Sequence, residues 1–421
     1  MIKVYYKIEF ELKSPLALSS GESEETDRDL MKDSRGIPYI PASSIAGVCR
    51  GAIAKNGGTD IEYYFGNAKS ENSGDVNSRI VFYDAQMQDG VHYTVSVRDS
   101  VKLDKYKVAE DGAKFDMEIL ESGVIFVTYL EQNLYEGDED ICKKIIAHML
   151  RGNVFFGGKT MRGYGEIGSV KAKRVRFDLD DKEDALNWIE FDLYDNKQYG
   201  DIEIERIDVA GSSIILELQQ KGGISIRKYT TRAARDQSHP EPDYEQLTVA
   251  DGKGTIPVVP GTSWAGAFRH RMTELGMSED EINKLFGEVG ISNGSDIVKS
   301  RSKIRFSETQ LEGADEKTIT RTAIDRFTGG AKDGALYTER TYYGGKGVLK
   351  ISYPSDIKDD SKKYLAAAIC DLHYGLLAVG GLTAVGRGIF EISRINGNKT
   401  THDDSQSFFN QVMAELQGGI Q

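Results

Sequence analysis

One string occurs twice in this chain of 421 residues. IPYIPASSIAG begins at Ile37, and IPVVPGTSWAG begins at Ile256. Both place two prolines at a fixed spacing, then small hydroxylated residues, then Ala-Gly, a combination that core packing alone does not demand. A string that recurs at long separation points to internal duplication, so the flanking sequence should repeat as well.

The flanking sequence does repeat, in the same order. Apolar stretches end at Phe65-Gly66 and Phe286-Gly287, SRIVFYDAQ pairs with SKIRFSETQ, LDKYKVAEDGAKF pairs with IDRFTGGAKDGALY, and GGKTMRGYGEI pairs with GGLTAVGRGIFEI. Five pairs in register predict a tandem duplication. We place the first domain at residues 1–190, a solvated connector in the acidic segment 191–205, and the second domain at 206–421.

Each repeat has the pattern of an α+β domain. It opens with an alternating strand, 4–12 or 212–220, after which the proline pair fixes an extended backbone ahead of a helix. Further strands, a second helix and a glycine-rich string before a last strand complete the order, which approximates β-α-β-β-α-β. The predicted fold is therefore two tandem ferredoxin-like domains, a layout that RNA-recognition modules share. The predicted helices are 44–55, 140–152, 263–276 and 362–377.

Charge and cysteine content restrict the possible functions. The formal net charge of −13 argues against a general nucleic-acid coat, so any nucleic-acid hypothesis must identify a local basic groove. Three scattered cysteines suit a reducing cytoplasm, and no Cys or His cluster has zinc spacing. No apolar run is long enough to span a bilayer, and no Ser/His/Asp or Cys/His signature is present.

Two features of each repeat are candidates for phosphate contact. Glycines in the G-G-x-T-x-x-G-x-G strings let backbone amides approach a phosphate, unless they serve only tight turns and close packing. The helix starts after the Pro-rich strings, where Ser43 or Thr262 is expected to cap, are natural anion sites, although a solvated helix face explains their arginines equally. The candidates are Ser43, Ser44, Arg50, Gly157, Gly158, Lys159, Thr160 and Arg162, then Thr262, Ser263, Arg269, Arg271, Gly380, Gly381, Thr383 and Arg387.

Two kinds of loop carry further candidates. Segments 98–118 and 321–341 mix basic, aromatic and small residues, which predicts hairpins that lie along or wedge into a nucleic acid, or else plain solvated hairpins. Their wedge residues are Lys105, Tyr106, Arg326 and Phe327.

The loops before the Pro-rich strings contain aspartates, which in isolation are usually solvated or cap a turn. These aspartates are Asp27, Asp29 and Asp33, then Asp236, Asp243 and Asp251.

Together these motifs resemble the RAMP superfamily, the repeat-associated proteins that form the backbone of type III CRISPR effector complexes. The resemblance covers nearly the whole chain twice, and two backbone-type units in one polypeptide look most like the fused double subunit of type III-D complexes. It implies a cytoplasmic ribonucleoprotein whose partners are CRISPR RNA, target RNA and other type III subunits. The glycine-rich loops and first helices would bind the guide backbone, and the two hairpins would act as thumbs between guide–target base pairs.

The resemblance also implies an endoribonuclease that uses loop aspartates. Asp27 and Asp33 match the family pattern, so Asp27 is the predicted catalytic residue. Asp243 takes the corresponding place in the second repeat, but the stretch to Asp251 is longer and Asp236 competes for the role. The carboxylate would accept a ribose 2′-hydroxyl proton, and a divalent cation, Mg²⁺, would neutralise phosphate charge while held partly by RNA, because the sequence shows no metal-ligand set.

Three functions remain open from the sequence. The first is a guide-binding subunit that cleaves target RNA. The second is a purely structural guide-binding backbone subunit without nuclease activity. The third is an α+β module that binds carbohydrate or protein and no nucleic acid. Co-purification of RNA with the chain separates the third from the other two.

Overall fold

The computed structural model of the chain describes residues 1–21, 26–57, 59–67, 77–103, 109–204, 212–228, 242–250, 254–291, 297–400 and 404–418. They form two compact units. Unit 1 comprises Met1–Val97, Asp116–Thr160 and Tyr164–Ala210, and unit 2 comprises Arg98–Phe115, Met161–Gly163 and Gly211–Gln421. Two short pieces of the first repeat therefore belong to unit 2. Within these described ranges, no helix combines the length and apolar character that crossing a membrane requires.

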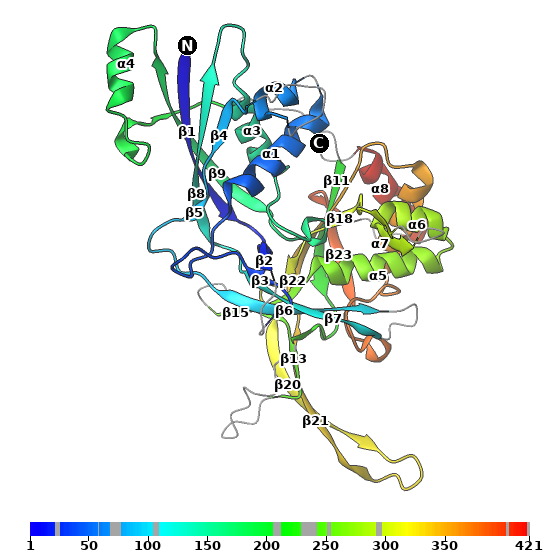
Figure 1. The fold of residues 1–421 in the computed structure, drawn as a ribbon. Helices are drawn as coiled ribbons and strands as arrows, with labels where there is room; N and C mark the ends of the chain where they lie inside the picture. Colours follow the sequence, from blue (N-terminus) through cyan, green and yellow to red (C-terminus); the bar gives the residue numbers. More distant parts are fainter. Residues whose placement is uncertain are drawn as a thin grey trace. The chain divides into compact units, whose positions relative to one another are not determined.

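Unit 1 is built on an antiparallel sheet with the strand order β10-β9-β1-β8-β4, and β5 also pairs with β8 (Figure 1). The strands are β1 (Ile2–Leu12), β4 (Ile80–Phe82), β5 (Gln86–Met87), β8 (Ile125–Leu134), β9 (Ile167–Asp178) and β10 (Gly200–Asp201). Helix α1 (Ala42–Asn56) and the short α2 (Ile61–Phe65) connect β1 to β4, and α3 (Ile141–Leu150) connects β8 to β9.

The alternation of β1 explains how this sheet is covered on both faces. Val4, Tyr6, Ile8, Phe10 and Leu12 are buried in one core with residues of α1 and α3, as expected when successive side chains point to opposite faces. On the other face, Tyr5 packs in a second, aromatic cluster with Tyr129, Phe177 and Tyr199. Helix α4 (Lys182–Ile189) closes that cluster, where Trp188 Nε1 donates to the Tyr5 hydroxyl at 2.9 Å.

Part of the predicted connector, residues 191–205, takes part in that covering. It includes the short helix η2 (Asn196–Gln198) and strand β10, which pairs with β9. Phe191 and Leu193 pack against the aromatic cluster on the same face. This segment is therefore a structured part of unit 1 as far as residue 204.

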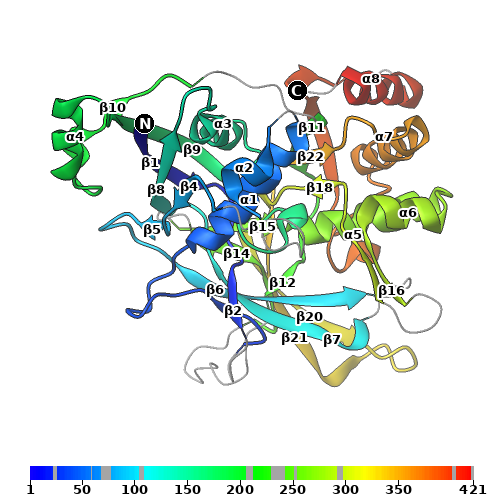
Figure 2. The same ribbon diagram turned by 45° about the horizontal axis from the view of Figure 1, so that its top comes forward.

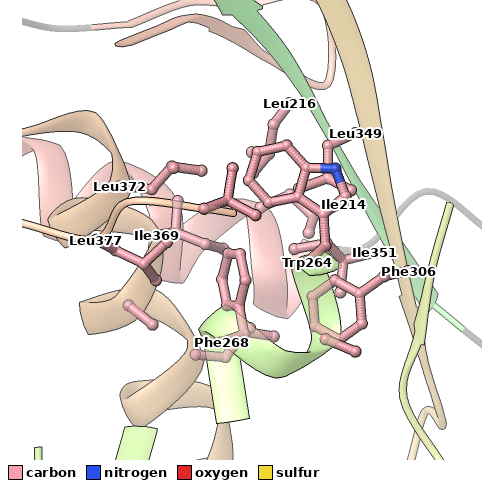
Figure 3. Close-up of a cluster of buried hydrophobic side chains, with 14 of the residues drawn as sticks. Ile214, Leu216, Trp264, Phe268, Phe306, Leu349, Ile351, Ile369, Leu372 and Leu377 are labelled. Atoms are coloured by element: carbon pink, nitrogen blue, oxygen red, sulfur yellow. The ribbon is translucent and has the colours of Figure 1, made fainter. Parts of the chain in front are cut away.

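Unit 2 repeats the sheet order, β18-β22-β11-β23-β24. Its strands are β11 (Ser212–Gln220), β18 (Arg305–Phe306), β22 (Lys346–Tyr353), β23 (Phe390–Ile395) and β24 (Asn398–Lys399). Helices α5 (Gly261–Glu274) and α6 (Glu279–Phe286) lie between β11 and β18, α7 (Asp359–His373) between β22 and β23, and α8 (Ser405–Gly418) at the end (Figure 2). In Figure 3, Trp264 and Phe268 of α5 lie among side chains of β11, β22 and α7 in the unit 2 core.

Long hairpins and short strands surround these two sheets. Strands β20 (Asp315–Ile324) and β21 (Ala331–Tyr343) form the yellow hairpin that extends away from the unit 2 helices in Figure 1. Strands β6 (Val95–Leu103) and β7 (Ala109–Leu120) pair with each other. The shorter strands are β2 (Ser19–Gly21), β3 (Asp29–Leu30), β12 (Arg227–Lys228), β13 (Tyr244–Gln246), β14 (Thr248–Ala250), β15 (Thr255–Val259), β16 (Glu288–Ile291), β17 (Ile297–Ser300) and β19 (Thr309–Gln310).

The structure confirms a mixed α/β fold, with a helix at each of the four predicted places. Helices α1, α3, α5 and α7 differ from the predicted ranges only near their ends, where sequence patterns are least informative. The opening strands β1 and β11 also lie where the alternating segments predict them.

Candidate functional site

Asp27 lies in the loop ahead of β3, and its side chain is exposed. It makes a reciprocal pair of hydrogen bonds with Asp116 of β7. The Asp27 N–H donates to Asp116 Oδ1 at 2.9 Å, and the Asp116 N–H donates to Asp27 Oδ2 at 2.9 Å. The Glu118 N–H donates to the Arg28 carbonyl at 2.9 Å next to this pair. The loop is thus fixed to β7 with two carboxylates side by side.

Asp243 of unit 2 has a matching contact. It is exposed just ahead of β13, and its Oδ2 accepts the Thr338 N–H of β21 at 2.8 Å. Strand β13 then pairs with β21, and Arg340 donates to Glu245 at 2.8 Å. Asp243 therefore holds the place of Asp27, with a threonine where unit 1 has a second carboxylate.

The remaining loop aspartates differ from these two. Asp33 Oδ1 accepts the N–H groups of Arg35 and Ile37 at 2.8 and 3.0 Å, and these bonds, that of Ile37 first, lower the Asp33 pKa. Asp29 accepts the Thr26 hydroxyl at 2.5 Å. Both aspartates hold the shape of the first loop. The competing Asp236, and Asp251, lie outside the described residues.

The predicted caps by Ser43 and Thr262 are wrong. Helices α1 and α5 begin after Pro41 and Pro260 with no side-chain cap, so the hydroxyls of Ser43, Ser44, Thr262 and Ser263 lie inside the first turns. In unit 1 the Ala42 N–H donates instead to Asp84 Oδ1 at 2.7 Å. Ser43 is exposed, and the other three hydroxyl residues are half-buried.

The predicted phosphate-binding arginines already have protein partners. Arg50 donates to the Gly66 carbonyl at 3.1 Å, and Arg269 donates to the Gly287 carbonyl at 3.1 Å, so each binds the end of the short helix that follows it. Arg271 donates to Asp371 at 2.7 Å, which raises the Arg271 pKa. Arg162 donates to the Phe286 carbonyl at 3.0 Å.

Among the residues predicted to contact phosphate, Arg387 differs most from the prediction. Its side chain is only 3% exposed, because it donates to Glu339 and to the Tyr343 hydroxyl inside unit 2. The pattern G-G-x-T-x-x-G-x-G aligns Arg387 with buried Tyr164, not with Arg162. The structure therefore does not bring Arg387 to the surface where we predicted it.

The two glycine-rich loops make the same kind of backbone hydrogen bond. The Gly158 N–H donates to the Ala17 carbonyl at 2.6 Å, and the Gly381 N–H donates to the Ser225 carbonyl at 2.7 Å. A Cβ on Gly157 would lie 2.4 Å from the Ala17 oxygen. Close backbone packing therefore requires a glycine at position 157. This agrees with the interpretation that the glycines of these strings serve tight turns and close packing. Thr160 is buried and Thr383 half-buried, and Gly380 packs similarly on Ser225.

The residue after each glycine pair adopts a left-handed conformation, with φ of 52° at Lys159 and 56° at Leu382. Such a φ in a residue other than glycine costs roughly 1–3 kcal/mol and is found most often at functional sites. Burial, and secondarily the charge of Arg28, lowers the pKa of Lys159 to about 8. Since Arg28 adjoins Asp27, this places a cation of reduced pKa near the Asp27 loop.

The RNA contact that the sequence predicts for Lys159 should depend on pH. The ammonium is protonated below its pKa of about 8 and is lost as the pH rises through that value. We expect the wild-type chain to lose about threefold to tenfold more RNA affinity between pH 7 and pH 9 than Lys159→Arg, whose guanidinium stays charged. Filter-binding titrations at both pH values measure this. If Lys159→Gln shows the same pH profile as the wild type, the Lys159 ammonium does not contact the RNA.

The β20–β21 hairpin displays an aromatic side chain at its tip. Phe327 is 94% exposed, and Arg326 beside it is exposed too. Asp325 Oδ1 accepts the N–H groups of Thr328 and Phe327 at 2.8 and 2.9 Å, which lowers the Asp325 pKa. The turn is thus ordered by its own aspartate while Phe327 stays in solvent. The first-repeat candidates Lys105 and Tyr106 lie outside the described residues.

Asp116 is the site residue that sequence reasoning missed. Charged residues in a strand are usually solvated, so nothing local singles it out. Among the described residues, no group of three or more His, Cys, Asp or Glu side chains is placed to hold a metal ion. The Asp27–Asp116 pair alone would suit Mg²⁺, which commonly binds one or two carboxylates together with substrate phosphates.

Two comparisons with known proteins bear on this geometry. A family model described as the RAMP superfamily matches residues 9–167 and 209–391. These segments contain both loop aspartates, both Pro-rich strings and both glycine-rich loops. No curated protein matches the chain.

Proposed function

Because the chain belongs to the RAMP superfamily, we propose that it is the fused double backbone subunit of a type III-D CRISPR effector complex, and that Asp27 cleaves guide-paired target RNA. The strand orders support a ferredoxin-like domain in each unit. The strand that follows the second main helix, β9 or β23, lies beside the first strand, β1 or β11, as expected for β-α-β-β-α-β. Such domains recur in RNA recognition.

The observation that carries the proposal is the placement of Asp27. Its carboxylate is exposed and fixed by an N–H from the base of a long hairpin, and Asp243 has the same contact in unit 2. A fixed, solvated carboxylate can accept a proton from a ribose 2′-hydroxyl that a neighbouring thumb has displaced from the duplex. The 2′-oxygen then attacks the adjacent phosphorus, and the bond from phosphorus to the 5′-oxygen of the next nucleotide breaks. The products are a 2′,3′-cyclic phosphate and a 5′-hydroxyl, whose oxygen takes its proton from water.

Nearby groups would help with the charge of that phosphate. Lys159 and Arg28 supply positive charge beside the Asp27 loop. A Mg²⁺ ion held by Asp27, Asp116 and RNA oxygens would neutralise phosphate charge. At the helix starts, the exposed Ser43 of α1 and the half-buried Thr262 of α5 remain proposed phosphate contacts, whereas the Ala42 N–H already donates to Asp84.

The residues around Asp243 favour a structural role for unit 2, in which it supports the guide without cleaving RNA. Thr338 stands where unit 1 has Asp116, and Leu382 stands where unit 1 has Lys159. Without the second carboxylate and the cation, Asp243 has less support for phosphate chemistry. We therefore assign cleavage to unit 1 first, and guide support to unit 2.

RNA that accompanies the purified protein tests the proposal. The complex should retain RNA of repeat-derived sequence after a wash in high salt and should cleave a complementary RNA. A protein that leaves such a wash free of RNA, with nucleic-acid absorbance at background, would refute guide binding and favour a module without RNA.

Removing the aromatic ring at the hairpin tip tests the thumb role. Phe327→Ala should leave the affinity for single-stranded guide within about twofold, because the hairpin that carries the ring extends away from the unit 2 helices (Figure 1). It should weaken target pairing about tenfold, since stacking on one base is worth about 1–3 kcal/mol. Leu336→Ala, at another exposed apolar position of the hairpin, is the matched control. Equal target binding by wild type and Phe327→Ala contradicts the assignment.

A further inference from the structure

Two aromatic rings flank the hydrogen bond of Asp243 in unit 2. Tyr244 directly follows Asp243 in the chain. Tyr337 directly precedes Thr338, whose N–H donates to Asp243 Oδ2 at 2.8 Å. The two rings meet edge to face, with centroids 6.0 Å apart and planes at 76°. Both are half-buried in the four-stranded sheet β12-β13-β21-β20, so aromatic side chains lie next to the Asp243 carboxylate.

An arginine lies over the Tyr244 ring. The guanidinium carbon of Arg227 is 3.8 Å from the ring centroid, well inside the range of a cation–aromatic contact. Strand pairing sets this position, because Arg227 of β12 lies opposite Gln246 of β13. Arg227 is exposed, and no carboxylate in the described part of the chain pairs with it. We call Arg227, Tyr244 and Tyr337 the unit 2 stack.

The chemistry of the unit 2 stack fits an unpaired nucleobase. Proteins stack the splayed bases of RNA on aromatic rings and on the planes of arginine guanidinium groups. Here the plane is in place before a base binds, because Tyr244 supports the guanidinium and Tyr337 supports Tyr244. A side chain that is already held loses less conformational freedom when a ligand binds, which favours affinity.

Unit 1 has the same fold without this stack. Counted from the carbonyl that accepts the N–H of the second glycine of each glycine-rich loop, Ser19 stands at the place of Arg227. The residue after the loop aspartate is Arg28, where unit 2 has Tyr244. A serine hydroxyl offers no plane for stacking. Folding of the domain therefore does not require the stack, and a ligand specific to unit 2 explains it.

We infer that the unit 2 stack binds the base of the target nucleotide displaced beside Asp243, and that it favours a purine there. The inference rests on the proposed function, which supplies the displaced nucleotide. The guide does not read this nucleotide, because a displaced base is unpaired. Its identity is read instead by stacking strength, and the two fused rings of a purine stack more strongly on a guanidinium than the single ring of a pyrimidine.

Photo-cross-linking identifies the nucleotide that the stack binds. A target RNA complementary to the guide carries 4-thio-2′-deoxyuridine at one displaced position at a time. The missing 2′-hydroxyl prevents cleavage there. The purified effector complex is bound to each RNA, irradiated and digested. Mass spectrometry should find one displaced position joined to the peptide that contains Arg227 or to the one that contains Tyr244. Cross-links to neither peptide from any displaced position overturn the inference.

Binding of four RNAs that differ only at this position measures the preference. All four carry a 2′-deoxyribose there. Adenine and guanine should bind the wild-type complex about threefold to tenfold more tightly than cytosine and uracil. Arg227→Lys keeps the charge but loses the plane, so its four affinities should agree within about twofold. Tyr244→Phe keeps the ring beneath the guanidinium and should keep the preference. Arg394→Lys, the same change at a partly exposed arginine of β23, should keep it too.

The outcomes separate this inference from the proposed function. Equal affinity of the wild-type complex for the four RNAs overturns the inference while RNA binding itself stands. A purine preference that Arg227→Lys retains, or that Arg394→Lys loses, also overturns it. A wild-type complex that binds none of the four RNAs refutes the proposed function, and the inference falls with it.

Discussion

Replacing Asp27 with asparagine in the assembled complex should remove one cut of a complementary target RNA while target binding persists. Asparagine keeps an oxygen that can accept the Asp116 N–H, so the loop stays attached to β7. The substitution removes the carboxylate charge, which is both the proposed proton acceptor and part of the proposed Mg²⁺ site. General base catalysis contributes about a hundredfold to ten-thousandfold, so the rate at that position should fall by this factor. Mapping the fragments of an end-labelled RNA over time measures it.

Two further aspartates serve as controls for that experiment. Asp33→Asn makes the same charge change in the same loop, at a residue whose carboxylate holds a turn, and should leave every cut in place. Asp243→Asn should erase a second, separate cut if unit 2 is active. An unchanged pattern would make unit 2 a structural copy. An Asp27→Asn complex that yields every wild-type fragment at the wild-type rate refutes the catalytic role.

The sequence predicted the framework because duplication supplied its own internal comparison. Matching strings located the opening strands and the four main helices, and the loop aspartates followed from their place before the Pro-rich strings. The structure adds that Asp243 makes the hydrogen bond that Asp27 makes. The competing Asp236 lies outside the described residues.

The errors have physical causes that a sequence pattern does not carry. Arg387 looks like a loop cation, yet its partner Glu339 is 48 positions away in the chain and draws it into the interior. Ser43 looks like a cap, yet Asp84 supplies the acceptor from the segment between β4 and β5. Both depend on tertiary contacts that override local propensity. Asp116 was missed for the same reason.

The glycine-rich loops pose the question that the sequence left open, between phosphate approach and close packing. Gly388 and Gly386 are a matched pair for answering it, because both have a positive φ, of 71° and 82°. A Cβ on Gly388 would lie 1.9 Å from the Val379 carbonyl oxygen, whereas one on Gly386 meets nothing within 4 Å. An alanine at either position therefore carries the cost of a positive φ. Only the alanine at position 388 also collides with the backbone.

Gly388→Ala should therefore lower the free energy of unfolding of unit 2 by about 3 kcal/mol, the sum of a φ cost of about 1 kcal/mol and an overpacking cost of about 2 kcal/mol. Gly386→Ala should cost about 1 kcal/mol. Urea unfolding followed by Trp264 fluorescence in a Trp188→Phe background isolates the unit 2 core, where Trp264 is fully buried. If Gly388→Ala is destabilised as stated but binds RNA normally below its transition, this glycine serves packing. Equal stability of the two variants would contradict the collision, and loss of RNA binding by a stable Gly386→Ala would instead assign its open surface to phosphate approach.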